Sequence, residues 1–269
     1  MVRKILNEAA KKLTNSPTPL LDARVLLSKA LNCENALVVF RDLTDKEIST
    51  FNEYIVKRMQ GIPVSYITGE KEFMGLNFIL NNSTLIPRPD TECLVEKVIE
   101  HNNFSAPRIL DLCTGSGCIG ISLAYMIKNS SVELTDISLE ALNAAIENIN
   151  LHNLNSRVKA YKLDVISDAI ENNYDIITAN PPYIPTEVVK GLDVSRFEPV
   201  RALDGGADGL DFYRIIIEKA YYALNENGIL ALEIGYDQGE SVPKLMNKFK
   251  SVYVYKDYGE NDRVVIGMK

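Results

Sequence analysis

Apolar residues recur at helical spacing through the first 70 residues of the chain. The pattern predicts helices over residues 1–13, 19–31, 35–40 and 45–59. Pro19 suits the first turn of a helix, and Thr44 followed by Glu47 has the pattern of a capping box. Gly61 and Pro63 then end the last helix. The pattern therefore predicts a small helical bundle over residues 1–70.

A different pattern follows the bundle. Residues 71–90 contain two short strand-like runs that predict a hairpin linker. Beyond Pro107, strand-like and helical segments alternate. Strands are predicted over residues 108–113, 131–137, 158–164, 174–180 and 228–235, and helices over 117–128, 139–150 and 210–224. Such alternation predicts an α/β domain over residues 91–269, with a mostly parallel, Rossmann-like sheet covered by helices on both faces. Two strand-like runs at the end of the chain add an antiparallel C-terminal hairpin.

Composition narrows the class of protein. The 269 residues are 46% hydrophobic and 24% charged, and no apolar run approaches the about 18 residues of a membrane span. The N-terminus lacks the apolar core of a signal peptide, and the four cysteines and two histidines form no pattern of disulfides or metal ligands. We therefore expect a cytoplasmic protein with reduced thiols, no metal site and no membrane partner.

The net charge of -7 is concentrated in the α/β part of the chain. Residues 1–80 hold 11 basic and 9 acidic side chains, whereas residues 81–269 hold 18 basic and 27 acidic side chains. Since an acidic surface repels a phosphate backbone, no direct nucleic-acid substrate is expected.

A glycine-rich loop directly follows the first predicted strand of the α/β domain. Gly115, Gly117 and Gly120 match the pattern G-x-G-x-x-G at the start of a helix, where backbone N–H groups can hold a nucleotide-like cofactor. Asp136 ends the next strand, 21 residues after Gly115, where its carboxylate could bind two ribose hydroxyls. These features fit both NAD and S-adenosyl-L-methionine (AdoMet).

Two further carboxylates favour AdoMet. Asp111 ends the first strand, where it would repel a pyrophosphate but suit the ammonium and sulfonium charges of AdoMet. Asp164 follows the third strand and could accept a hydrogen bond from the adenine amino group. The sequence therefore predicts an AdoMet site.

The fourth strand ends in Asn180, Pro181, Pro182 and Tyr183, which we call the NPPY segment. The prolines hold the backbone extended and remove two N–H donors, which leaves a rigid group of acceptors beside the cofactor loop. A planar amide or aromatic amine is a poor nucleophile toward a methyl group. If the Asn180 side-chain oxygen and the Pro181 carbonyl accept its two hydrogens, its lone pair can be directed at the sulfonium methyl group. Tyr183 would stack on the flat target group.

Five segments together resemble the HemK/PrmC family of protein-glutamine N5-methyltransferases, over nearly the whole chain. They are IPRPDTECLVE (residues 86–96), DLCTGSGCIG (111–120), TDIS (135–138), NPPYI (180–184) and ALDGGADGLDFYR (202–214). The resemblance implies a seven-stranded class I AdoMet-dependent methyltransferase fold, preceded by a helical domain that recognises a class I peptide chain release factor. It also implies methyl transfer to the glutamine of a Gly-Gly-Gln loop, with S-adenosyl-L-homocysteine as the product.

The resemblance also implies site residues. The AdoMet-binding set implied in this way comprises Cys113, Thr114, Gly115, Ser116, Gly117, Asp136, Asp164 and Val165, with Asn180 also beside the cofactor. The NPPY segment would hold the glutamine, and Arg88 and Glu92 would line the same cleft. Cys113 stands where many relatives have glycine, and Val165 stands where some have an aromatic residue. We expect both departures to change cofactor affinity without removing activity.

Two other substrates share this chemistry. A ribosomal protein glutamine could be methylated by a sister enzyme with the same catalytic motif, and the helical bundle would decide between the two. A DNA adenine amine would also fit the NPPY segment, but the chain has no Lys/Arg stripe and no long extra region to read DNA. A monomeric release factor methyltransferase is the first expectation.

Overall fold

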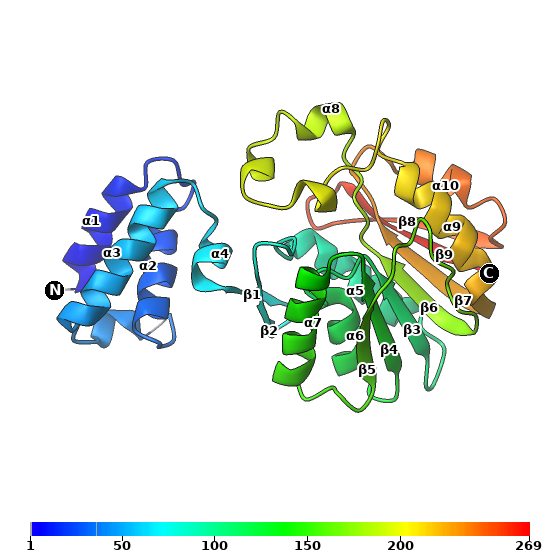
Figure 1. Cartoon of the computed structure of the whole chain (residues 1–269), viewed down its shortest axis with the longest axis horizontal. Helices are drawn as coiled ribbons and strands as arrows, with labels where there is room; N and C mark the ends of the chain where they lie inside the picture. Colours follow the sequence, from blue (N-terminus) through cyan, green and yellow to red (C-terminus); the bar gives the residue numbers. More distant parts are fainter. Residues whose placement is uncertain (1, 36) are drawn as a thin grey trace. The chain divides into compact units, whose positions relative to one another are not determined.

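The computed structural model describes residues 2–35 and 37–269, with the side chain of Val39 excepted. Contacts divide the chain between Glu70 and Lys71 into two compact units, which we describe separately (Figure 1). None of the helices in the described ranges combines the length and the apolar composition that a membrane span requires.

The first unit consists of short helices around one core. The helices are α1 (Val2–Lys12), α2 (Pro19–Ala30), the 3-10 turn η1 (Val38–Phe40), α3 (Asp45–Met59) and α4 (Val64–Thr68). Leu26, Leu27 and Phe51 are fully buried between them. Of the helix expected over residues 35–40 only a 3-10 turn forms, and residue 36 lies outside the described residues. The five-residue α4 was not predicted, because so short a segment shows no helical period.

Local signals at the helix ends form as predicted. Pro19 occupies the first turn of α2. The Thr44 hydroxyl accepts a hydrogen bond from the Glu47 N–H at 3.3 Å, and the Glu47 carboxylate accepts one from the Thr44 N–H at 2.8 Å. The capping box is therefore confirmed.

The second unit is built on a seven-stranded sheet with the order β5-β4-β3-β6-β7-β9-β8. Its strands are β3 (Arg108–Leu112), β4 (Ser131–Asp136), β5 (Val158–Lys162), β6 (Tyr174–Ala179), β7 (Leu224–Glu233), β8 (Ser251–Lys256) and β9 (Asp262–Met268). Strands β3 to β7 are mutually parallel, whereas β9 runs antiparallel to both β7 and β8. The predicted fold, a mostly parallel sheet with an antiparallel C-terminal hairpin, is confirmed.

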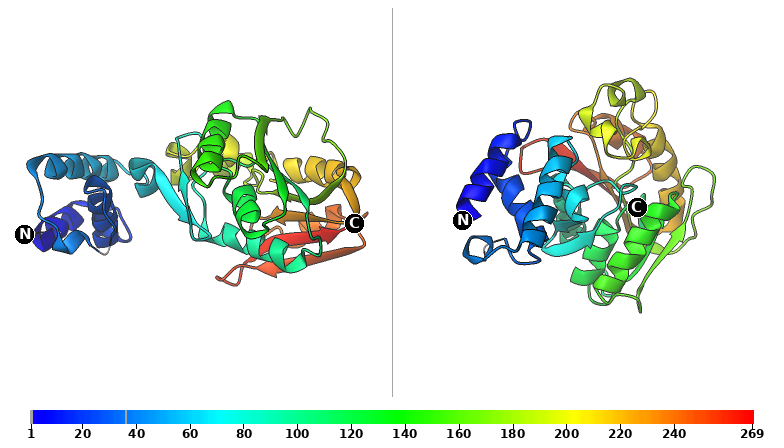
Figure 2. Two further views of the ribbon diagram at one scale, coloured as in Figure 1. Left: turned by 90° about the horizontal axis from the view of Figure 1, so that it is seen from below. Right: turned by 60° about the vertical axis from the view of Figure 1, so that its left-hand side comes forward.

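Helices cover both faces of this sheet (Figure 2). On one face, α5 (Pro89–His101), α6 (Cys118–Met126) and α7 (Leu139–Leu151) share a core with the hairpin of β1 (Glu70–Phe73) and β2 (Leu76–Ile79). On the other face, α9 (Asp211–Ala223) and α10 (Ser241–Leu245) share a second core. Phe73 and Phe78 of the hairpin are almost fully buried. The interpretation of residues 71–90 as a linker between domains stays a prediction.

Three helices of this unit were not predicted: α5, α8 (Thr186–Val189) and α10. Helices α8 and α10 are too short to show a period. Helix α5 has 13 residues and carries a start signal, because Pro89 occupies its first turn together with Asp90 and Glu92. That signal could have revealed the helix.

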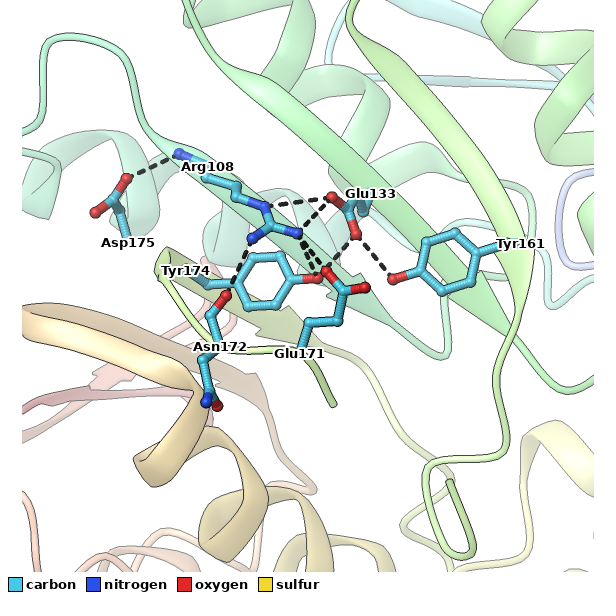
Figure 3. A network of polar contacts seen from close by, with 7 residues as sticks. All are labelled: Arg108, Glu133, Tyr161, Glu171, Asn172, Tyr174 and Asp175. Atoms are coloured by element: carbon cyan, nitrogen blue, oxygen red, sulfur yellow. Dashed lines mark hydrogen bonds and ion pairs between the residues drawn. The ribbon is translucent and has the colours of Figure 1, made fainter. Parts of the chain in front are cut away.

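A polar network ties strands together where β3 begins (Figure 3). The Arg108 guanidinium donates to the carboxylates of Glu133 and Glu171, in each case at 2.9 Å. The hydroxyls of Tyr161 and Tyr174 donate to the second oxygen of Glu133 at 2.8 Å. These bonds join β3, β4, β5 and β6 at the end of the sheet opposite the site.

Candidate active site

The carboxyl ends of β3, β4, β5 and β6 open onto a cavity of about 610 Å³. Its walls come from residues within 83–91, 112–119, 135–140, 163–166, 180–182 and 199–202, with Phe212 from α9. Ligands of open α/β sheets bind at this edge, and the volume is that of a small-molecule site. The cavity lies entirely within the second unit.

The glycine loop makes a tight turn beneath this cavity. Gly115 and Gly117 have φ values of +56° and +83°, a region that L side chains rarely adopt. A Cβ atom on Gly120 would lie 2.2 Å from a methyl carbon of Leu134 and 3.1 Å from the Asp111 Cβ atom, so a larger residue there would require the buried Leu134 side chain to shift. Cys113 also has a positive φ of +55°, although it is not glycine. Its side chain lines the cavity together with Thr114, Gly115 and Ser116.

Asp136 lies at the end of β4 and lines the cavity. One of its oxygens accepts a hydrogen bond from the Gly115 N–H and the other from the Ser138 N–H, both at 2.9 Å. Burial raises the pKa of this carboxyl, and the two N–H donors oppose the increase. Each oxygen can accept further hydrogen bonds, which suits a pair of ligand hydroxyls.

Asp111 is fully buried and is not among the residues that line the cavity. Its carboxylate accepts hydrogen bonds from the Thr114 hydroxyl at 2.5 Å, the Thr178 hydroxyl at 2.7 Å and the Gly120 N–H at 3.2 Å. Burial raises its pKa to about 6. Asp111 therefore joins β3 and β6 to the glycine loop, and its direct contact with a cofactor stays a prediction.

The loop after β5 forms another wall through Asp164 and Val165. The Asp164 carboxylate accepts hydrogen bonds from the Ile166 N–H at 2.9 Å and the Ser167 hydroxyl at 3.0 Å, and the first of these contributes most to lowering its pKa. Lys219 of α9 donates from its ammonium group to the carbonyls of Val165, Ile166 and Asp168 at 2.7–2.9 Å. Lys219 therefore holds the loop after β5 in place. Nothing in the sequence around Lys219 indicated this role.

The NPPY segment leaves β6 and reaches the cavity through Asn180 and Pro182. The other two residues of the segment, Pro181 and Tyr183, are not among the lining residues, and neither is Gly117 of the glycine loop. The Tyr183 hydroxyl lies 3.4 Å from the buried carboxylate of Glu233, at the end of β7. Burial raises the pKa of Glu233 to about 7 and also raises the pKa of Tyr183. Glu233 was not a predicted site residue, and its position beside Tyr183 comes from the pairing of β6 with β7.

Of the two cleft residues implied by the resemblance, only Arg88 lines the cavity. Its guanidinium pairs with the buried carboxylate of Glu198 at 2.5 Å, and the same carboxylate accepts a hydrogen bond from the Ile86 N–H at 3.2 Å. Glu92 instead accepts a hydrogen bond from the Met74 N–H in the β1–β2 turn at 2.7 Å. The Glu92 carboxylate thus binds the turn of the β1–β2 hairpin. A contact between Glu92 and the substrate stays a prediction.

Comparison with known proteins agrees with this geometry. Residues 4–69 match the PrmC N-terminal domain, and residues 89–196 match the methyltransferase small domain. A release factor glutamine methyltransferase of Clostridium botulinum is 41% identical over 93% of this chain and 92% of its own length. The chain belongs to the release factor glutamine methyltransferase family. The enzyme of that name from Clostridium acetobutylicum is 37% identical over 96% of this chain and 94% of its own length.

A solved methyltransferase from Pyrococcus furiosus shares the fold. It has a TM-score of 0.55 and 21% identity, and the match covers 82% of this chain and 98% of that one. The cofactor of this chain, as a member of the release factor glutamine methyltransferase family, is AdoMet. The cavity fits it in size and chemistry, because Asp136 offers acceptors to hydroxyls while Ile137, Leu163 and Val165 offer apolar surface.

Proposed function

We propose that this enzyme methylates the side-chain amide nitrogen (N5) of the glutamine in the Gly-Gly-Gln loop of class I peptide chain release factors. The main support is that Asn180 and Pro182 of the NPPY segment share one cavity with Asp136 and the glycine loop. One of the two proposed acceptors for the target amide, the Asn180 side chain, therefore adjoins the cofactor groups. The names of the relatives support the choice of a release factor as the substrate.

When bound, AdoMet would supply an electrophilic methyl group on its sulfonium sulfur, and the product would be S-adenosyl-L-homocysteine. Asp136 would accept hydrogen bonds from the ribose hydroxyls, and Asp164 would accept one from the adenine amine. Val165 would pack on the adenine ring. The cofactor-binding set also includes Asp111, Cys113, Thr114, Gly115, Ser116, Gly117 and Asn180.

The catalytic residues in this proposal are Asn180, Pro181 and Tyr183. The Asn180 side-chain oxygen and the Pro181 carbonyl accept the two amide hydrogens, which orients the nitrogen lone pair toward the methyl group and stabilises the developing positive charge. Tyr183 packs against the flat amide, and its hydroxyl contact with Glu233 holds the ring. Pro182, Arg88 and Glu92 complete the substrate-binding set.

This chemistry requires no strong general base in the cavity. The two histidines of the chain make other contacts: His101 bonds the Tyr255 hydroxyl at 2.6 Å, and His152 bonds the Asn77 carbonyl at 2.8 Å. Neither lines the cavity. The amide proton passes to water after methyl transfer, when the N-methylated nitrogen carries a positive charge and has become strongly acidic.

We also propose that the enzyme is a monomer. A cytoplasmic location follows from the proposed function, since translation termination takes place in the cytoplasm. We assign residues 1–70 to recognition of the release factor and residues 91–269 to catalysis.

A methyl-transfer assay with labelled AdoMet tests the proposal. Purified class I release factor is offered to the enzyme, and a release factor whose loop glutamine is replaced by alanine serves as the control. We expect label on the first protein and none on the second. Label on both proteins, or on neither, would refute the assignment, and ribosomal protein or DNA would then be tested with the same cofactor.

A further inference from the structure

The NPPY segment has unusual support from a second segment of the chain. Residues 203–210 run beside it and exchange backbone hydrogen bonds with Ile184, the residue that directly follows it: the Ile184 N–H donates to the Leu203 carbonyl, and the Gly205 N–H donates to the Ile184 carbonyl, both at 2.9 Å. Ile184 and Asp204 form an isolated parallel bridge. We call residues 203–210 the support segment.

Two glycines allow the support segment to lie directly on the NPPY backbone. A Cβ atom on Gly205 would lie 2.7 Å from the Tyr183 Cα atom and 2.8 Å from the Pro182 carbonyl oxygen. A Cβ atom on Gly209 would lie 2.3 Å from the Tyr183 carbonyl oxygen. All three distances are too short for any other residue, so backbone contacts backbone without an intervening side chain.

Gln238 joins the two segments. Its side chain is only 6% exposed, and its Oε1 atom accepts a hydrogen bond from the Gly235 N–H at 2.9 Å. Its Nε2 group donates to the carbonyls of Tyr183 at 3.1 Å and Gly209 at 3.2 Å. One buried amide thus connects the end of β7, the NPPY segment and the support segment.

The composition of the NPPY segment explains why such a donor is needed. Pro181 and Pro182 have no N–H groups, so this stretch cannot be anchored to its neighbours as a normal strand continuation is. The remaining backbone anchor points are its carbonyls and the N–H groups of Asn180 and Tyr183. Gln238 supplies a donor for the carbonyl of Tyr183, directly after the prolines.

We propose that Gln238 and the glycines of the support segment are positioning residues, which set the place of the Asn180 and Pro181 acceptors relative to the cofactor cavity. The inference rests on the proposed function. Neither Gln238 nor Gly209 lines the cavity, so each acts through the NPPY backbone. A displacement of about 1 Å in such acceptors can cost on the order of 100-fold in rate.

The first test compares two glycines with the same backbone conformation. Gly209 and Gly75 have φ values of +74° and +73°, but a Cβ atom on Gly75 would meet nothing within 4 Å. Gly209→Ala and Gly75→Ala therefore share the cost of a positive φ, and only the first places a Cβ atom against the Tyr183 backbone. We expect Gly209→Ala to lower kcat at least tenfold, with KM and the AdoMet Kd within twofold of the wild-type values, and Gly75→Ala to leave all three unchanged.

Gln238→Met provides a second variant of similar size without the hydrogen bonds. Its control is Tyr174→Phe, which removes a partly buried hydrogen bond to Glu133 at the other end of β6. We expect kcat to fall at least tenfold in Gln238→Met alone, again without a matching change in the AdoMet Kd. An unchanged kcat, or a rise in the AdoMet Kd as large as the fall in kcat, would overturn the inference.

Hydrogen exchange gives a readout that does not depend on the substrate. In Gln238→Met, the amides of Ile184 and Gly205 should exchange faster, whereas the β6 amides should stay as in the wild type. If wild-type enzyme does not methylate release factor, the proposed function fails while this measurement still tests the positioning role. Unchanged exchange at Ile184 and Gly205 would refute that role whatever the substrate.

Discussion

Replacement of Glu233 by glutamine is expected to stabilise the second unit, and to do so most at alkaline pH. Glu233 is 2% exposed, and burial raises its pKa from the ordinary value of 4.5 to about 7, although Thr91 and Arg263 favour its charged form. Glutamine keeps the shape and an acceptor for the Tyr183 hydroxyl but carries no charge. The wild-type enzyme alone must bury a carboxylate when the pH is high.

The sign and size of the effect follow from proton linkage. Because the folded state binds the proton more tightly than the unfolded state, the carboxyl contributes its full stability below pH 4.5 and loses it as the pH rises to about 7. The difference between pKa values of 4.5 and about 7, at about 1.4 kcal/mol for each unit, amounts to about 3 to 4 kcal/mol. About 2 kcal/mol of this falls between pH 5.5 and pH 8.5.

Calorimetric unfolding at these two pH values measures the effect. A change of about 2 kcal/mol corresponds to about 4–8 °C in Tm for a unit of this size, so the Tm gain of Glu233→Gln should be larger by that amount at pH 8.5. Glu226→Gln on the same strand is the control, because Glu226 has 77% of its side chain exposed. An equal Tm change at both pH values would show that Glu233 does not titrate as a buried acid.

Three further predictions concern other parts of the chain. Asn180→Ala should lower the methyl-transfer rate by about 100-fold or more while the calorimetric Kd for AdoMet changes little, and an equal loss of both would contradict its role toward the target amide. Lys219→Met removes the hydrogen bonds that hold the loop after β5, so the Kd for AdoMet should rise about tenfold with kcat unchanged. An unaltered Kd would show that the position of this loop does not affect cofactor binding. Arg58→Met removes the partner of the Asp22 carboxylate at 2.7 Å and should lower the free energy of unfolding of the first unit by about 2 kcal/mol. In a protein that already carries Asp22→Asn, Arg58→Met should cause only a small further loss of stability. If Arg58→Met destabilises the wild type and the Asp22→Asn variant equally, the two side chains do not stabilise the unit as a pair.

Much of the second unit was readable from local pattern. The alternation of strand and helix predicted the parallel sheet, because buried strands and amphipathic helices have different periods. The glycine loop, Asp136 and the NPPY segment were found because strand ends carry ligand groups at one edge of such a sheet. The structure brings Asp136 and Asn180 to one cavity, as that reasoning requires. Their individual roles stay predictions.

The local sequence pattern did not predict the shortest helices or the hydrogen-bond partners of buried polar side chains. Helices α4, α8 and α10 have five residues or fewer, which is too few to show a period. Asp111 had the right place in the sequence for a cofactor ligand, but its carboxylate bonds Thr114 and Thr178 inside the fold. A strand position alone does not tell which polar group a side chain will contact.

The sequence by itself determined the order of elements, the cofactor loop and the rigid acceptor segment, because these depend on residues close together in the chain. Tertiary structure decided what holds them in place. Gln238 and Tyr183 are separated by 55 positions, and Lys219 and Val165 by 54. Such contacts arise only once sheet order and helix packing bring distant segments within hydrogen-bonding distance, and no local period encodes them.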